Sequence, residues 1–331
     1  MLKTLLSLTL FLLSLAASLA AQTTTTVSRP PASSEASPAD ELARRGPSSR
    51  TPDASEAARF PEPESGAVDR DVYANPYFAL SYRLPQGWTE SLKGPPPSDT
   101  GYYVLSSLKT AESTPGSNGM ILISAWDMFF LPRPAGNPLG LLQDMKETLS
   151  PVYVLEMPPK EIKVGNHSFA RFGYTAAELH WQVLVTEVRC HFVEFAFVGR
   201  DTELLDGLVQ GMNTLKLPPE AEVAAKDSAG FPACVKDYAS GDNVLHKVDP
   251  VMAGPRFTSV PVRIIIGADG RVKHIHVIHA FPDQARSVED ALAQWVFKPY
   301  RRNGVAREVE TGILFKFPAD EEKLPPVKET Y

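Results

Sequence analysis

Two histidines lie two residues apart in the C-terminal third of the sequence, at His274 and His276, with His279 close behind. Side chains two residues apart on a β-strand point to the same face, and a His-x-His pair on a strand can bind zinc. Such a site needs a third ligand, which the sequence does not place. The alternative is a polar stripe facing solvent, with Ile275 and Val277 turned inward. We therefore expect no metal site and no cofactor.

The chain contains two cysteines, Cys190 and Cys234. Two are too few for a disulfide scaffold or for a structural zinc site. In an oxidising compartment the two could pair, and the bond would then join two folded regions, because Cys190 lies at a strand turn and Cys234 opens the next region. Two separate, partly buried thiols are the alternative, since a sequence does not measure the distance between them.

The motifs of the common hydrolases and nucleotide-binding enzymes are absent. Ser, His and Asp residues occur, but the sequence has no G-x-S-x-G, no H-E-x-x-H and no P-loop. A formal net charge of −6 also argues against a nucleic-acid-binding protein, which needs a basic face. We expect a non-enzymatic protein. A hydrolase that uses a cleft in the first domain is the alternative from the enzyme class.

The N-terminus has the pattern of an export signal. Lys3 precedes an apolar run from Leu5 to Ala17, and Ser18-Leu19-Ala20 ends it with small residues at the −3 and −1 positions. Residues 1–20 are therefore predicted to be a cleaved signal peptide, and the protein to be periplasmic or secreted. The alternative is an uncleaved anchor that holds the chain in the inner membrane, facing the periplasm.

The length of 331 residues suits two domains with linkers. Of the 48 residues from Gln22 to Asp69, 28 are Pro, Ser, Thr or Ala and Phe60 is the only aromatic, a composition typical of disorder. We expect a disordered linker over residues 21–69, with local polyproline II at Pro61–Glu64. A shorter linker over 218–231 and a tail over 319–331 complete the division.

Strand patterns recur through the first predicted domain, residues 70–217. Alternating or continuous apolar residues predict strands at 78–84, 102–108, 120–126, 161–164, 169–174, 180–188 and 192–198. Helical spacing predicts helices over 139–149 and 204–212, the second capped by Asp201. Strands in series with two helices indicate an α+β fold, an antiparallel sheet covered by helices. Trp88 is expected to be a core residue at a strand end.

The segment Tyr77–Trp88, which reads YFALSYRLPQGW, and the late strand–strand–helix ending near Leu215 carry a resemblance to the PsbP-like family of small α/β/α domains. The resemblance covers about 140 residues. Because that family has no common catalytic residues, it implies a fold and no site.

The second predicted domain, residues 232–318, has the order β-β-α-β. Alternation over 260–266, a glycine turn over 267–270 and a return strand over 272–280 predict a hairpin. Ser287 is the expected N-cap of a helix to Val296, whose apolar stripe includes Trp295 as a core residue. A final strand follows over 305–317. All three strands can join one antiparallel sheet.

This order and three segments, Gly267–Val272, Val288–Pro299 and Gly312–Phe317, carry a resemblance to the C-terminal domain of TonB, the energy transducer of the Gram-negative periplasm. In that family the final strand is an open sheet edge that pairs with the N-terminal peptide of a receptor. The resemblance implies that this chain binds a peptide or protein partner, such as an outer-membrane receptor, by strand addition. The implied binding residues are Val309, Glu310, Thr311, Gly312, Ile313, Leu314, Phe315, Lys316 and Phe317.

Three features separate the chain from the TonB transducers. Residues 1–21 contain no histidine, the linker lacks Glu-Pro and Lys-Pro repeats, and Val248–Ala253 has no tyrosine where the family carries Tyr-Pro-x-x-Ala. We therefore expect a TonB-like binding module, with a membrane-anchored transducer as the alternative. An unprotected edge also pairs with itself, so a homodimer through the same strand competes with a partner.

The final strand should have one core face and one outer face. The core face is predicted to hold Val309, Thr311, Ile313, Phe315 and Phe317, and the outer face Glu310, Gly312, Leu314 and Lys316. A proline at an outward position such as Gly312 would remove an N–H group from the edge and is expected to impair strand addition.

Overall fold

The computed structural model describes residues 61–110, 119–218, 231–251 and 257–318. All of these belong to one compact unit, Gly46–Tyr331, while the unit Met1–Arg45 lies outside the described residues. The predicted signal peptide over 1–20, the linker over 21–60, most of the linker over 218–231 and the tail over 319–331 also lie outside them. The domain boundaries at residues 217 and 232 therefore stay predictions. No described helix has the length and apolar character needed to cross a membrane.

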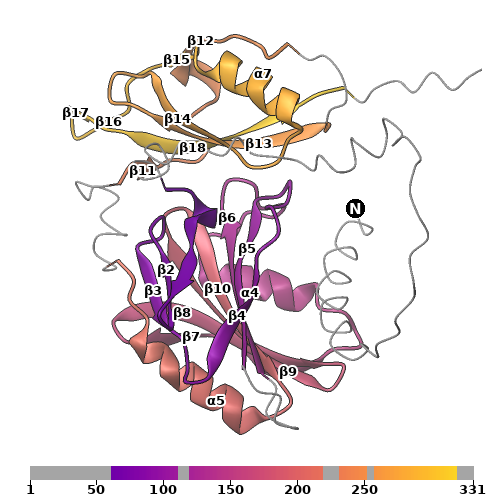
Figure 1. Ribbon diagram of the computed structural model, residues 1–331. Coiled ribbons are helices and arrows are strands. Elements are labelled where there is room, and N and C mark those ends of the chain that lie inside the picture. The colour runs from indigo at the N-terminus through magenta and orange to yellow at the C-terminus, as the bar shows by residue number, and fades with distance from the viewer. Residues whose placement is uncertain (1–60, 111–118, 219–230, 252–256, 319–331) are drawn as a thin grey trace, which may run out of the picture. The chain divides into compact units, whose positions relative to one another are not determined.

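The described part has a mixed α+β fold, as predicted, and its largest element is a seven-stranded antiparallel sheet (Figure 1). The strand order is β4-β5-β6-β10-β9-β8-β7. The strands are β4 (Trp88–Lys93), β5 (Tyr102–Thr110), β6 (Gly119–Asp127), β7 (Val154–Val164), β8 (His167–Ala176), β9 (Leu179–Val188) and β10 (His191–Gly199). Each contains or extends a strand predicted from the sequence, apart from β4, which begins at the buried Trp88.

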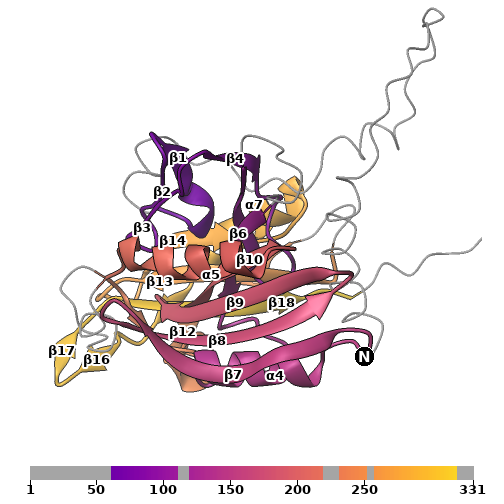
Figure 2. The same ribbon diagram turned by 90° about the horizontal axis from the view of Figure 1, so that it is seen from below.

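Two helices cover this sheet. The helix α4 (Pro138–Glu147) contacts β7, β8 and β9, and α5 (Thr202–Gly211) contacts β10. Figure 2 shows the two helices on opposite sides of the strands β7–β9. Every residue of β10 is buried, and this strand is the central one of the sheet, between β6 and β9. The predicted cap is confirmed, since the Asp201 carboxylate accepts hydrogen bonds from the N–H groups of Glu203 and Leu204.

The predicted linker is wrong for residues 61–69, which are ordered. They form the 3₁₀ turn η1 (Pro63–Ser65) and the strand β1 (Ala67–Asp69), which joins a three-stranded sheet with β2 (Val72–Asn75) and β3 (Leu80–Arg83). The polyproline II expectation for Pro61–Glu64 is wrong at Pro63 and Glu64, where tertiary contacts fix the turn, whereas Glu62 has an extended backbone. The side-chain amide of Asn75 donates to the Pro63 carbonyl at 2.8 Å, and Pro63 itself is buried.

A four-stranded sheet contains the C-terminal strands, in the order β11-β18-β13-β14. These are β11 (Ala233–Cys234), β13 (Ser259–Ile266), β14 (Val272–Val277) and β18 (Val309–Lys316), with α7 (Pro282–Leu292) packed on the sheet (Figure 1). Shorter elements are η2 (Met212–Thr214), η3 (Gly241–Asn243), β12 (Val244–His246), β15 (Val296–Phe297), β16 (Arg301–Arg302) and β17 (Val305–Ala306). The predicted β-β-α-β order and the antiparallel pairing of β13, β14 and β18 are confirmed.

Several element boundaries differ from the prediction. The helix predicted to reach Val296 ends at Leu292, because Val296 and Phe297 form β15, which pairs with β12. The helix α7 begins at Pro282 and encloses Ser287, whose hydroxyl donates to the Val251 carbonyl and does not cap the helix. Proline suits the first helical turn, where its missing N–H group has no partner to lose. The strand β14 ends at Val277, and β18 begins only at Val309 because residues 301–306 form a separate hairpin.

The predicted core residues of this region are buried. Val288, Ala291 and Leu292 of α7 and the adjacent Trp295 pack over the sheet, and the Trp295 indole N–H donates to the Val248 carbonyl at 2.7 Å. The turn between β13 and β14 requires glycine at position 270, where φ is +83° and a Cβ atom would lie 2.1 Å from the Phe297 carbonyl oxygen.

Candidate functional site

The strand β18 is only partly covered along its outer edge. It pairs with β13 over its whole length, and with β11 at Val309 and Glu310 alone. The predicted nine-residue edge is therefore wrong at its beginning, where β11 already occupies the hydrogen-bonding positions.

The remaining main-chain groups on this side have a defined direction. The Phe317 N–H donates to the Thr258 carbonyl, on the β13 side, whereas the Glu310 carbonyl accepts from the Val235 N–H on the opposite side. Because hydrogen-bond direction alternates along a strand, the N–H and C=O groups of Gly312, Leu314 and Lys316 point to the side of β11, beyond its end. No strand of the described chain pairs with them there. We call residues 312–316 the open edge.

The two faces of β18 agree with the prediction only in part. Val309, Thr311 and Phe315 are buried, and Ile313 and Phe317 pack against the same core. On the other face Leu314 is 44% exposed, as expected, but Glu310 is buried. The alternating pattern of β18 predicts which face lies against the core, but it does not show that another segment covers part of the outer face.

Gly312 shows which segment covers the predicted outer face. A Cβ atom at Gly312 would lie 2.6 Å from the Cβ of Phe129 and 2.9 Å from the Phe130 ring. The segment after β6 therefore packs directly on the backbone of β18. A proline at Gly312 would clash with it, so Leu314 is the better position at which to remove an N–H group from the edge.

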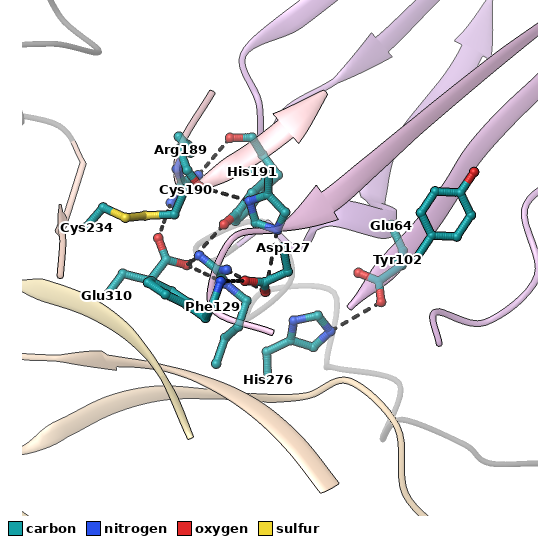
Figure 3. A network of polar contacts seen from close by, with 12 residues as sticks. Glu64, Tyr102, Asp127, Phe129, Arg189, Cys190, His191, Cys234, His276 and Glu310 are labelled. Atoms are coloured by element: carbon teal, nitrogen blue, oxygen red, sulfur yellow. Dashed lines mark hydrogen bonds and ion pairs between the residues drawn. A yellow bond between two sulfur atoms is a disulfide. The ribbon is translucent and has the colours of Figure 1, made fainter. Parts of the chain in front are cut away.

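A buried ionic network joins the four-stranded sheet to the seven-stranded sheet (Figure 3). Arg263 of β13 donates to Asp127, at the end of β6, with 2.6 Å between Nη1 and Oδ2. Its Nε and Nη2 atoms lie 3.2 and 3.0 Å from Oε1 of Glu310. Arg189 lies 3.6 Å from the other Glu310 oxygen, and the Tyr77 hydroxyl donates to Glu310 at 3.1 Å.

The charges in this network balance, with two guanidinium groups against two carboxylates. Burial raises the pKa of Glu310, but the positive charges of Arg263 and Arg189 outweigh burial and bring the pKa below its usual 4.5. For Asp127, burial raises the pKa more than the positive charge of Arg263 lowers it, so the pKa of this carboxyl group is above its usual value. Buried ion pairs of this kind fix geometry more than they add stability.

His191 is a fully buried neighbour of the network. Its Nδ1 atom lies 2.8 Å from the Arg189 carbonyl and donates to it, and Nε2 lies 3.8 Å from Asp127. Burial and the positive charge of Arg263 hold the pKa of His191 well below 6.5, so the ring is neutral.

Cys190 and Cys234 form a disulfide with a Cα–Cα distance of 6.0 Å (Figure 3). Cys190 lies in the turn between β9 and β10, and Cys234 in β11. The bond therefore fixes β11, the strand that covers the beginning of β18, to the seven-stranded sheet.

The predicted solvent-facing histidine stripe is wrong. His276 is buried and His274 nearly so, because the segment around η1 packs against this face of β14. The His276 Nε2 atom lies 3.3 Å from Glu64 Oε1 and 3.9 Å from Glu62 Oε2, and the His274 Nε2 atom lies 3.9 Å from Glu62 Oε1. The inward orientation predicted for Ile275 and Val277 is confirmed.

The two histidines have opposite pKa shifts. Burial alone lowers the pKa of His276, but the Glu64 charge outweighs burial and raises the pKa to about 9. Burial and the neighbouring His276 charge lower the pKa of His274 to about 4. The carboxylates therefore create a strongly negative environment around His276.

A cavity of about 290 Å³ lies beside these groups. Its lining includes Glu62, His274 and His276 together with Arg189, Arg263 and Glu310. The cavity is therefore lined both by residues of the ionic network and by residues of the histidine–glutamate cluster, which consists of Glu62, Glu64, His274 and His276. Its described lining contains no serine, threonine or cysteine that could serve as a nucleophile.

Comparisons with known proteins reveal only distant similarity. No family model matches the chain, and no curated protein matches it. The solution structure of a cyanobacterial PsbP (CyanoP) from Synechocystis sp. PCC 6803 aligns with a TM-score of 0.33 and 13% identity, over 46% of this chain and 96% of that one. The crystal structure of LpqN, involved in cell envelope biogenesis of Mycobacterium tuberculosis, aligns with a TM-score of 0.30 and 13% identity, over 43% and 84%.

Proposed function

We propose that this protein is an exported, non-enzymatic binding protein of the cell envelope, and that it holds a peptide or protein partner by strand addition at the open edge. The observation that carries the proposal is the row of main-chain groups at Gly312, Leu314 and Lys316, which point beyond the end of β11. An extended peptide placed there would continue the sheet and pair with these groups.

The N-terminal sequence and the disulfide support export. A positive start, an apolar run and small residues before Ala21 are typical of a signal peptide. Disulfides persist in oxidising compartments such as the periplasm and are rare in the cytosol. The Cys190–Cys234 bond therefore fits an exported protein.

The TonB-like order of elements supports the choice of the final strand as the binding element. In the family that the sequence resembles, the last strand pairs with a receptor peptide, and here β18 is the corresponding strand. We propose an outer-membrane receptor or another envelope protein as the partner. Because β11 already pairs with Val309 and Glu310, the added strand would span residues 312–316 and be short.

Side chains beside the open edge would select the partner. Leu314 is an exposed apolar side chain, and Lys316 beyond it is exposed and positively charged. Cross-strand neighbours on one face interact, so an apolar residue opposite Leu314 and an acidic residue opposite Lys316 would be favoured.

A pair of substitutions at one position tests the mechanism. Leu314→Pro removes the edge N–H group, and proline is tolerated on edge strands where the N–H faces solvent. Leu314→Ala is the matched control, which shortens the side chain but keeps the N–H. Peptides selected from a phage-displayed random library on the complete wild-type chain serve as the probe.

The selected peptides should bind Leu314→Ala at most about fivefold more weakly, the contribution of one cross-strand side-chain pair. They should bind Leu314→Pro at least tenfold more weakly, because the added strand loses about one main-chain hydrogen bond and its neighbours are disturbed. Circular dichroism of each variant checks that the fold is intact. Equal binding to a folded Leu314→Pro variant would show that the partner does not add a strand at this edge.

Sedimentation distinguishes self-association through the open edge from binding of a partner there. Pairing between two copies predicts dimers of the wild-type chain that a selected peptide dissociates. A chain that stays monomeric and binds peptide uses the edge for a partner.

A further inference from the structure

A group of three potential metal ligands lies where the η1 segment meets β14. One ligand atom each from Glu62, Glu64 and His276 lies within 4.8 Å of the others. The two carboxylates come from a Glu-x-Glu sequence at the start of the described chain, and the imidazole comes from β14, more than two hundred residues later. The sequence alone shows the histidine pair but no third ligand.

The state of His276 is a second and independent observation. Its side chain is 5% exposed, and its Nε2 atom is buried and faces the carboxylates, 3.3 Å from Glu64 Oε1 in an ion pair (Figure 3). Within the described part of the chain this Nε2 atom has the ion-pair contact but no hydrogen bond. The Oε2 atom of Glu64 is buried and has no hydrogen bond there either. Buried polar atoms without hydrogen bonds are uncommon in native proteins, and a bound ion is one way to satisfy them.

We propose that Glu62, Glu64 and His276 bind a divalent zinc ion, with His274 as the fourth ligand. Carboxylate oxygen and imidazole nitrogen are both common zinc donors, and four ligands are the usual number for a structural site. Zinc–ligand bonds of roughly 2 Å leave tetrahedral ligand atoms about 3.3 Å apart. The His276–Glu64 distance of 3.3 Å already satisfies this spacing.

The remaining ligand atoms need only small movements. His274 and His276 each lie 3.9 Å from an oxygen of Glu62. Glu62 and Glu64 are partly exposed and lie in or beside the three-residue turn η1, so small side-chain movements can bring them closer to β14. The cavity of about 290 Å³ that reaches Glu62 and His276 gives the ion a route of entry.

Both cysteines are in the disulfide, so no thiolate contributes to this site. A purely nitrogen and oxygen donor set favours zinc or a similar first-row ion over the soft copper(I) ion, which selects sulfur ligands. The bound ion would link the η1 segment to β14, and it would therefore attach the N-terminal end of the described chain to the four-stranded sheet.

Zinc chloride added to the complete, chelator-treated chain tests the proposal. Isothermal titration should give one ion per chain, and the thermal unfolding midpoint should rise with zinc concentration because the ion binds only the folded state. Cobalt(II) in place of zinc should give visible absorption bands typical of tetrahedral coordination, without a thiolate charge-transfer band.

Glu64→Gln is the first variant, because Glu64 is about one-third exposed and glutamine has nearly the same size and shape. It should weaken zinc binding roughly tenfold or more, and Glu62→Gln should do the same. His246→Gln is the matched control, since His246 is exposed on β12 and outside the cluster. No saturable zinc binding, or equal affinity of Glu64→Gln, Glu62→Gln and His246→Gln, would overturn the proposal.

Discussion

Arg263 and Asp127 are separated by 136 residues in sequence, yet their side chains meet at 2.6 Å and are both almost completely buried. Arg263 belongs to the four-stranded sheet and Asp127 to the seven-stranded sheet, so the pair connects the two. Glu310 completes the connection from β18, the strand that carries the open edge. The ion pair therefore lies beside the beginning of the open edge, because Arg263 is the β13 register partner of Gly312.

Asp127→Asn should lower the free energy of unfolding by about 3–5 kcal/mol, because it leaves the buried Arg263 with one anionic partner fewer. Urea denaturation measures the change. Glu178→Gln is the control, since it breaks the exposed Arg200–Glu178 pair, whose loss should cost at most about 1 kcal/mol. A similar decrease in the free energy of unfolding in the two variants would mean that the buried network contributes no more to stability than an exposed ion pair does.

Glu194→Gln should stabilise the protein at neutral pH. Glu194 is buried on β10 and accepts a hydrogen bond from the Trp126 indole at 2.8 Å, and burial raises its pKa. A carboxyl group whose pKa is raised by folding binds its proton more tightly in the folded state. The contribution of Glu194 to the free energy of unfolding is therefore favourable at low pH. It is lost as the pH rises through the pKa that Glu194 has in the folded protein.

Glutamine keeps an oxygen for Trp126 and removes the cost of the buried charge, so the gain should be on the order of 1 kcal/mol at pH 8. Thermal unfolding at pH 8 and at pH 4 measures it, and the gain should shrink at pH 4, where Glu194 is protonated. Glu161→Gln, at an exposed position on β7, serves as the control. A loss of stability at pH 8 would contradict this interpretation of Glu194.

The double variant Cys190→Ser/Cys234→Ser should unfold more easily. The bond spans 44 residues, and a closed loop of that size corresponds to about 4 kcal/mol in the chain-entropy model. The disulfide ties β11 to the seven-stranded sheet, and the Val235 N–H donates to the Glu310 carbonyl of β18, so amide exchange at Val235 should also become faster in the variant. Unchanged exchange there would show that β11 is held by other contacts.

Trp295→Ala should cost about 3–5 kcal/mol, as large core truncations do. The side chain is buried between α7 and the sheet, and its indole N–H bonds the Val248 carbonyl. Trp295→Phe, which keeps an aromatic ring but loses this hydrogen bond, should cost less. An Ala variant with wild-type urea stability would mean that the site relaxes without a cavity.

Much of the fold follows from local patterns. Alternation along β13 and β18, the glycine turn at Gly270 and the Asp201 cap are all readable from neighbouring residues, and the structure confirms them. Helix boundaries are harder to predict, because Pro282 and Ser287 both suit a helix start and only packing decides between them.

The candidate sites depend on contacts that local patterns do not contain. Glu62 and Glu64 lie in a proline-rich segment with the composition of a linker, so nothing in the sequence places them beside His276. Two signals could have pointed to the network. Arg263 is the one charged residue in the strand Val260–Ile266, and Asp127 directly follows an apolar strand. A lone charge in such a strand indicates a buried partner.

The central claim is that a partner pairs with the open edge, and residue-resolved amide hydrogen exchange tests it most directly. A peptide selected on the wild-type chain should slow exchange at Gly312, Leu314 and Lys316, whose N–H groups point outward. Ile313 and Phe315, directed at β13, should change little. Protection that alternates in this way is the predicted result. Tight peptide binding without protection at Gly312, Leu314 and Lys316 would contradict strand addition at the open edge.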